Sequence, residues 1–129
     1  MILETDQTEF DEAVSARDEG DYVTAVRKFK NLAEQGHPDA PFSLGVIYEK
    51  GKGTIQDLAE AAKWYRKAAD QGHFRAQNNL GSMYSRGRGV PQDRAEAERL
   101  FRKSAEQGNA KAQYNLGLMY AGNLDCIGR

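Results

Sequence analysis

The sequence has little that could form a disulfide or cross a membrane. Of its 129 residues, one is cysteine and three are proline. The single cysteine, Cys126, excludes a disulfide within the chain. No segment approaches the roughly 18 apolar residues of a spanning helix, so we expect no direct membrane span. The N-terminal segment MILETDQTEF is acidic and does not resemble a secretory signal, so a cytoplasmic location is the default expectation.

Neither sign of charge predominates. The formal net charge is −1 although 29% of the residues are charged. Nucleic acids and anionic membranes attract proteins with a strongly basic surface. The composition therefore predicts a soluble protein with no nucleic-acid partner.

The sequence repeats itself every 36 residues. A Leu-Gly pair, a tyrosine four residues after that leucine, and a glycine that ends the phrase AxQG all recur: Leu44, Leu80 and Leu116; Tyr48, Tyr84 and Tyr120; Gly36, Gly72 and Gly108. Repeats of this length indicate stacked units that bury their apolar faces against one another. We therefore expect residues 1–129 to form a single repeat domain.

Each unit has the pattern of two helices. In residues 57–71, DLAEAAKWYRKAADQ, apolar residues recur at three- and four-residue steps. Asp57 precedes Glu60 by three residues, and Asp93 precedes Glu96 in the same way, which predicts two capping boxes. The leading helices are expected near residues 39–50, 75–86 and 110–121.

The turns give the unit boundaries. Gly36, Gly72 and Gly108 are expected to end the trailing helices, because glycine adopts the left-handed conformation most easily. Pro38 suits a first helical position, and Asn109 suits an N-cap. A leading helix near residues 7–19, joined by the short turn DEGD, makes the first pair different. The expected units are 7–36, 37–72, 73–108 and a half repeat at 109–122, followed by a tail at 123–129.

The motifs LGxxY, GxG and an Asp-led helix ending in KAAxQGH resemble the Sel-one-like repeat (SLR), a relative of the tetratricopeptide repeat. The resemblance extends from Asp21 to about Gly122, and the first pair, residues 7–36, is more similar to a tetratricopeptide repeat. The resemblance to the Sel-one-like repeat implies an all-α, right-handed superhelical solenoid of antiparallel helix pairs. It also implies that the leading helices line a concave groove that binds a protein or peptide partner, as in a scaffold or adaptor.

Under that resemblance, the groove positions are those on the face of each leading helix opposite LGxxY. They are Phe10, Val14, Arg17, Phe42, Val46, Glu49, Lys50, Asn78, Ser82, Arg86, Tyr114 and Leu118. The apolar members could hold side chains of a peptide, and Arg17 and Arg86 could pair with acidic groups. The alternative is a solvated face that carries a few apolar residues by chance.

No arrangement of residues predicts catalysis or a cofactor. The segment GKGT lacks the spacing of a phosphate-binding loop, and no serine lies in a nucleophile motif. His37 and His73 are one repeat apart without a third recurring ligand, so we interpret them as turn residues and expect no metal site. The chain is expected not to be an enzyme.

Glycines lie inside three of the expected helices, where each costs about 0.8–1 kcal/mol relative to alanine. Gly45, Gly81 and Gly117 therefore predict close approach of a bulky neighbouring side chain.

The last leading helix has no trailing partner in the pattern. Leu116, Met119 and Tyr120 would then be partly uncovered. We expect either self-association through this helix or coverage by Leu124 and Ile127 of the tail. An alternative to groove binding is that the chain is an assembly or accessory domain of an enzyme or cell-envelope complex.

Overall fold

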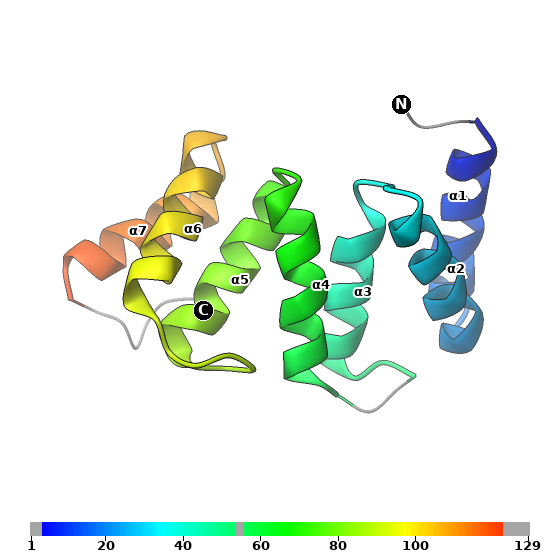
Figure 1. Ribbon diagram of the computed structural model, residues 1–129, viewed down its shortest axis with the longest axis horizontal. Helices are drawn as coiled ribbons and strands as arrows, with labels where there is room; N and C mark the ends of the chain where they lie inside the picture. The colour runs from blue at the N-terminus through cyan, green and yellow to red at the C-terminus, as the bar shows by residue number, and fades with distance from the viewer. Residues whose placement is uncertain (1–3, 54–55, 123–129) are drawn as a thin grey trace.

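The computed structural model describes residues 4–53 and 56–122, and within these ranges every regular element is an α-helix (Figure 1). The helices are α1 (Glu4–Asp18), α2 (Tyr22–Glu34), α3 (Ala40–Lys50), α4 (Leu58–Asp70), α5 (Phe74–Arg86), α6 (Arg94–Glu106) and α7 (Ala110–Tyr120). The predicted helix positions agree with these bounds to within a few residues. Three antiparallel pairs are followed by α7, which has no trailing helix among the described residues.

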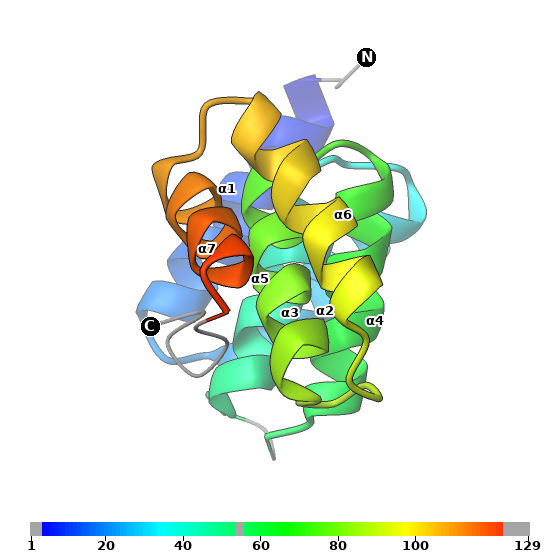
Figure 2. The same cartoon turned by 90° about the vertical axis from the view of Figure 1, so that its left-hand side faces the viewer.

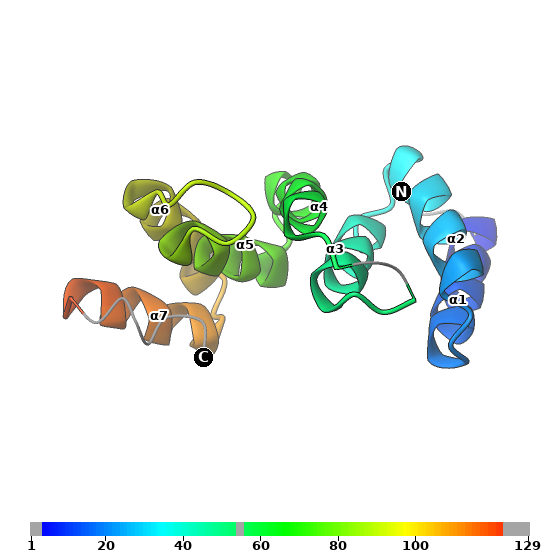
Figure 3. The same cartoon turned by 90° about the horizontal axis from the view of Figure 1, so that it is seen from below.

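The pairs stack in a row, and each helix packs mainly against its neighbours in the sequence. Seen from below in Figure 3, the odd-numbered helices lie along one side of the row and the even-numbered helices along the other. Figure 2, which views the row from the end that carries α6 and α7, shows the earlier pairs stacked behind them. The predicted class, an all-α right-handed superhelical solenoid, is confirmed.

Polar side chains begin the helices at the predicted positions. The Asp57 carboxylate accepts the backbone N–H of Glu60 at 3.0 Å, and the Asp93 carboxylate accepts that of Glu96 at 3.0 Å. Asn109 accepts the N–H of Lys111 at 3.1 Å. These bonds satisfy amides that have no partner within their own helix, so the three N-caps are confirmed.

The second half of each predicted capping box is wrong. The backbone N–H of Asp57 donates to the carbonyl of Tyr48 at 3.0 Å, and Asp93 forms the same bond with Tyr84 at 2.9 Å. The amide that the glutamate would have accepted is therefore already used. Glu60 instead accepts the indole N–H of Trp64 at 3.1 Å.

The prediction for Pro38 is also wrong. Helix α3 begins two residues later, at Ala40, and the proline of its first turn is Pro41. The ring of His37 explains the difference, because its Nδ1 accepts the backbone N–H of Asp39 at 3.1 Å. This local bond favours a turn over a helix at Pro38.

Glycines in two leading helices receive aromatic rings from the trailing helices, as predicted. A Cβ placed on Gly45 would lie 2.5 Å from the ring of Tyr65, and one on Gly81 would lie 2.8 Å from Phe101. Both rings are fully buried. Among the described residues, none comes within 4 Å of a Cβ placed on Gly117. The close-packing prediction is therefore confirmed at two positions and wrong at the third.

The glycines that end the trailing helices adopt the predicted left-handed conformation. Gly36, Gly72 and Gly108 have φ values of +88°, +89° and +90°. Each follows the last helical turn and reverses the chain into the next leading helix. The 36-residue period is therefore a period of backbone conformation as well as of sequence.

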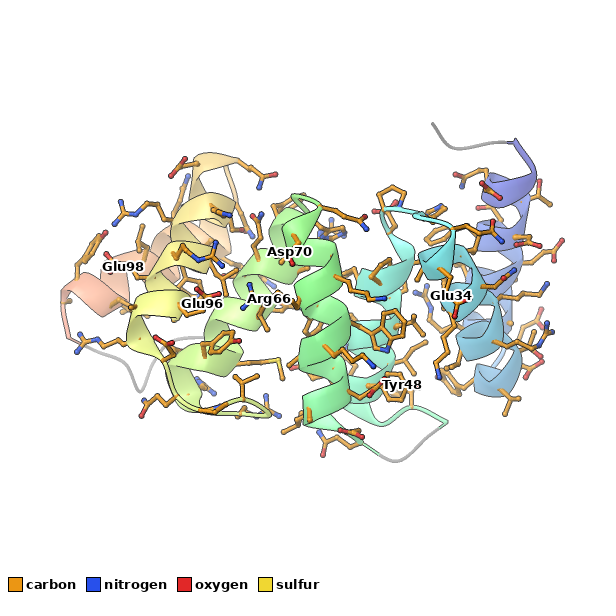
Figure 4. All side chains as sticks on the ribbon, in the orientation of Figure 1. Glu34, Tyr48, Arg66, Asp70, Glu96 and Glu98 are labelled. Carbon is orange, nitrogen blue, oxygen red and sulfur yellow. The ribbon has the colours of Figure 1, made fainter. Side chains whose placement is uncertain are left out.

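A cation on a tyrosine recurs along the even-numbered helices. Lys30 lies 5.8 Å from the ring centre of Tyr48, and Arg66 lies 5.5 Å from that of Tyr84. Arg66 also donates to Glu96 of the next pair at 2.6 Å, and Figure 4 shows it between the two pairs. This contact joins α4 to α6 across α5, so it links neighbouring units.

The C-terminal end is uncovered only in part. Tyr120 is 62% exposed and Leu116 is half-buried, as predicted. Met119 is 5% exposed, so the prediction for this residue is wrong: it packs in the cluster that contains Ala97 and Phe101. Residues 123–129 lie outside the described part, and self-association through α7 stays a prediction.

Candidate functional site

A hollow of about 210 Å³ lies between α5 and α7, at the C-terminal end of α3. Five of the predicted groove residues line it: Glu49, Asn78, Ser82, Arg86 and Tyr114. Because all of them come from odd-numbered helices, the hollow opens on the side where the resemblance places a groove. We call it the α5–α7 hollow.

Five further residues of the hollow were not among the predicted groove positions: Asn79, Met83, Arg88, Lys111 and Asn115. Asn79 and Asn115 occupy the same place in successive units, so the period could have identified them. Arg75 and Lys111 also share one repeat position, which is Asp39 in the unit before. The charge at this position thus changes from negative to positive along the row, and the sequence alone could have pointed to Lys111 as a site residue.

The floor of the hollow is a pair of buried amides. Asn115 donates from Nδ2 to Oδ1 of Asn78 at 3.0 Å, and the two residues are 3% and 7% exposed. Buried amides are stable only when they are hydrogen-bonded. The floor is therefore polar and fixed, whereas Tyr114 at the edge is 62% exposed.

Among the described residues, one carboxylate lines this hollow, and it is already engaged. Glu49 accepts the phenol proton of Tyr65 at 2.5 Å, and its other oxygen lies 3.6 Å from Arg88. Burial, and then the Glu49 carboxylate, raise the pKa of Tyr65, so the phenol stays protonated and donates. Glu49 thus serves the contact between α3 and α4 as well as the wall of the hollow.

The cations of the hollow are in excess. Arg86, Arg88 and Lys111 lie around one carboxylate. Neither Arg86 nor Lys111 forms an ion pair with a carboxylate of the described residues. The chain as a whole has a net charge of −1, so this positive charge is local.

A second hollow adjoins the first and is partly aromatic. Phe42, Phe74 and Arg75 line it, together with residues that it shares with the α5–α7 hollow: Asn78, Asn79 and Lys111. Phe74 is 38% exposed, and Arg75 lies 5.5 Å from its ring centre. We call it the aromatic hollow.

Several predicted groove residues pack against the core. Phe10, Val14, Phe42, Val46 and Leu118 are half-buried and contact the three core clusters. Arg17 pairs with its neighbour Asp18 at 3.2 Å, and Lys50 is exposed at the end of α3. Neither hollow includes Phe10, Val14 or Arg17. Their role in binding stays a prediction.

The two histidines lie in equivalent turns, as predicted. His37 stacks on Phe10 and His73 stacks on Phe42, each with ring centres 4.5 Å apart. His73 also caps α5, because its Nδ1 accepts the N–H of Ala76 at 3.3 Å. Burial lowers the pKa of His73, and this favours the neutral ring. The Asp39 carboxylate, 3.5 Å away, acts in the opposite direction but has the smaller effect. These contacts give both rings a structural role.

Two kinds of feature are absent from the described ranges, 4–53 and 56–122. No three metal-ligating side chains of histidine, cysteine, aspartate or glutamate come together there. None of the seven helices is long and apolar enough to cross a bilayer.

Comparison with protein families decides the relationship. The family model described as Sel1 repeat matches residues 38–73, 74–109 and 110–123. The chain belongs to the Sel1-repeat family. The first helix pair lies outside the matched residues. A search of curated proteins gives no match.

Solved structures of Sel1-repeat proteins are similar along most of the chain. A protective antigen of uropathogenic Escherichia coli with an SLR fold is 38% identical, with a TM-score of 0.84 over 91% of this chain and 26% of its own. A Sel1 repeat protein from Oxalobacter formigenes is 34% identical, with a TM-score of 0.80 over 88% of this chain and 47% of its own. This chain therefore spans about a quarter and about half of the two relatives.

A more distant structure shares the fold alone. Cysteine-rich protein B of Helicobacter pylori is 21% identical, with a TM-score of 0.67 over 87% of this chain and 95% of its own. Sel1-repeat proteins are generally protein-interaction scaffolds. The family therefore indicates a general class of function. The two hollows are the places where this chain exposes charged, polar and aromatic side chains on the side of the odd-numbered helices.

Proposed function

We propose that this Sel1-repeat chain is a protein-interaction module that holds a peptide or protein segment across α3, α5 and α7. The observation that carries the proposal is the α5–α7 hollow, where Arg86 and Lys111, which form no ion pair with the described residues, lie beside a fixed polar floor. Packing within a unit requires neither Arg86 nor Lys111, because both side chains are exposed. Such residues are free to contact a partner.

The experiment compares the two sides of the row. A photo-crosslinking phenylalanine analogue replaces Tyr114, which is exposed at the edge of the hollow, or Lys63, which is exposed on α4. Both variants are irradiated in extracts of the source cell, and the crosslinked proteins are identified by mass spectrometry. We expect a reproducible partner from the Tyr114 position and not from Lys63.

The opposite result has a clear meaning. Crosslinks from Lys63 alone would contradict groove binding and favour an assembly role for the outer helices. Circular dichroism of both variants checks that the helices are intact. Because each substituted side chain is exposed, we expect changes in stability within about 0.5 kcal/mol.

A further inference from the structure

We propose that the partner segment is acidic: an aspartate or glutamate side chain enters the α5–α7 hollow, and an apolar side chain close to it in the peptide enters the aromatic hollow. This inference rests on the proposed function and names the chemistry of the partner. It starts from charge, since three cations and one engaged carboxylate of the described residues line the first hollow.

The geometry of the cations suits a carboxylate. Arg86 and Lys111 come from different helices, α5 and α7, and converge on one hollow. A guanidinium can donate two parallel hydrogen bonds to a carboxylate, and an ammonium adds a third donor. A hollow of about 210 Å³ has room for a side chain of this size.

The two hollows are continuous through Asn78, Asn79 and Lys111, which line both. An extended peptide advances about 3.3 Å per residue and points successive side chains to opposite sides. When an acidic residue occupies the first hollow, the next side chain therefore points away from the surface, and the side chain two residues along lies on the side of Phe42 and Phe74. Both rings offer apolar surface, and Phe74 is 38% exposed.

The change of charge along the row gives the peptide a direction. One repeat position holds Asp39, then Arg75, then Lys111. Asp39 belongs to the unit that precedes the two cations, and its carboxylate lies 3.5 Å from His73, so the negative end of this series lies on the N-terminal side of the hollow. The acidic part of the peptide is therefore expected toward α7.

A nucleic acid fits this surface less well. Backbone phosphates require several cations in series, and their binding is opposed by nearby carboxylates. Glu49 lines the hollow and Asp39 lies at the start of the charge series. The local excess is enough for one or two carboxylates and too small for a run of phosphates.

The test selects phage-displayed random peptides of roughly twelve residues on the wild-type chain. The same selection uses Arg86→Gln with Lys111→Gln, and a matched control, Lys63→Gln with Lys103→Gln, on the even-numbered helices. Selected peptides are synthesised, and their Kd is measured by fluorescence anisotropy. Circular dichroism checks the fold of each variant.

We expect wild type to enrich Asp or Glu two residues away from an apolar residue. The Kd should rise about tenfold or more for the groove variant, and also for peptides whose acids are replaced by Gln or Asn, but less than about twofold for the control. Arg86→Glu with Lys111→Glu should instead select basic peptides.

Three results overturn the inference in different ways. If the selected peptides are not enriched in acidic residues but still crosslink at Tyr114, the acidic-partner inference is wrong. The proposal that the groove binds a peptide then remains. No selectable peptide, or peptides that crosslink only at Lys63, would remove both. A single-stranded oligonucleotide that binds more tightly than any peptide, and loses binding in the groove variant, would assign the hollow to nucleic acid.

Discussion

The units centred on α5 and α7 carry the same motif in different surroundings. The sequence LGSMY in α5 and LGLMY in α7 both form helix, but α6 covers one and no described helix covers the other in the same way. Leu80 is 1% exposed while Leu116 is half-buried. The comparison shows that the motif encodes the helix, whereas the neighbouring helix decides the burial of its residues.

The difference is sharpest at the glycine of the motif. Phe101 lies against Gly81, whereas nothing described lies within 4 Å of a side chain added at Gly117. The same glycine therefore makes room for a ring in one unit and has no such role in the described surroundings of the other. Substitutions at the two positions should separate packing from helix propensity.

The largest expected effect is that of leucine. Gly81→Leu must displace the buried Phe101 ring, and we expect a loss of about 3 kcal/mol in the free energy of unfolding. Gly117→Leu should be neutral or stabilising, because leucine forms helix better than glycine. Urea unfolding measures both. Equal stabilities for the two variants would remove the packing difference on which the comparison rests.

Alanine should give a smaller effect of opposite sign at the two positions. A Cβ at Gly81 lies 2.8 Å from Phe101, so we expect Gly81→Ala to lose about 1 kcal/mol despite its better helix propensity. Gly117→Ala should gain up to about 1 kcal/mol. Thermal melts of the pair decide the sign. If alanine raises the melting temperature at both positions, the Phe101 ring moves away from Gly81 at little cost in free energy.

The smallest effect concerns the charges that join units. Hydrogen bonds from Arg99, then Arg66, hold the pKa of Glu96 at about 2, below its ordinary value of 4.5. Because the folded pKa is the lower one, this stabilisation is complete above about pH 5 and is lost as the pH falls toward 2. We expect Glu96→Gln to cost on the order of 1 kcal/mol at pH 7 and to weaken the acid dependence.

Glu98→Gln is the matched control at the end of the row. Its carboxylate pairs with Arg102 of the same helix, at 2.9 Å, and among the described residues no cation of another unit pairs with it, although Arg102 itself donates to Tyr120 of α7. We expect a change below about 0.5 kcal/mol at pH 7. Urea unfolding at pH 3 and pH 7 compares the variants. If Glu98→Gln lowers the free energy of unfolding as much as Glu96→Gln does, the contact between units does not contribute to stability.

Local features were predictable because a few neighbouring residues determine them. The caps at Asp57 and Asp93 and the turn at Gly72 each depend on contacts within one turn of helix. The error at Pro38 came from the ring of His37, whose bond to the backbone two residues away has no simple sequence signal. The error at Met119 came from a neighbour in α6.

The candidate site was predictable in part for the same reason. The resemblance to the Sel-one-like repeat placed Glu49, Asn78 and Arg86 on one side of the row, and the structure brings them to one hollow. The sequence did not show that Tyr65 would donate a hydrogen bond to Glu49. Nor did it show that Arg88, which lies in a turn, would line the hollow. The first contact joins the two helices of one unit, and the second, between Arg88 and Glu49, crosses from one unit to the next.

The sequence by itself determined the helices, most of their ends and the 36-residue period. Only the tertiary structure decided which residues of neighbouring units meet, such as Asn78 with Asn115, and which residues stay exposed, such as Tyr120. The physical reason is that contacts between units depend on the angle at which the pairs stack. Rings that pack on Gly45 and Gly81 set how closely the paired helices approach, and this is a property of several helices together.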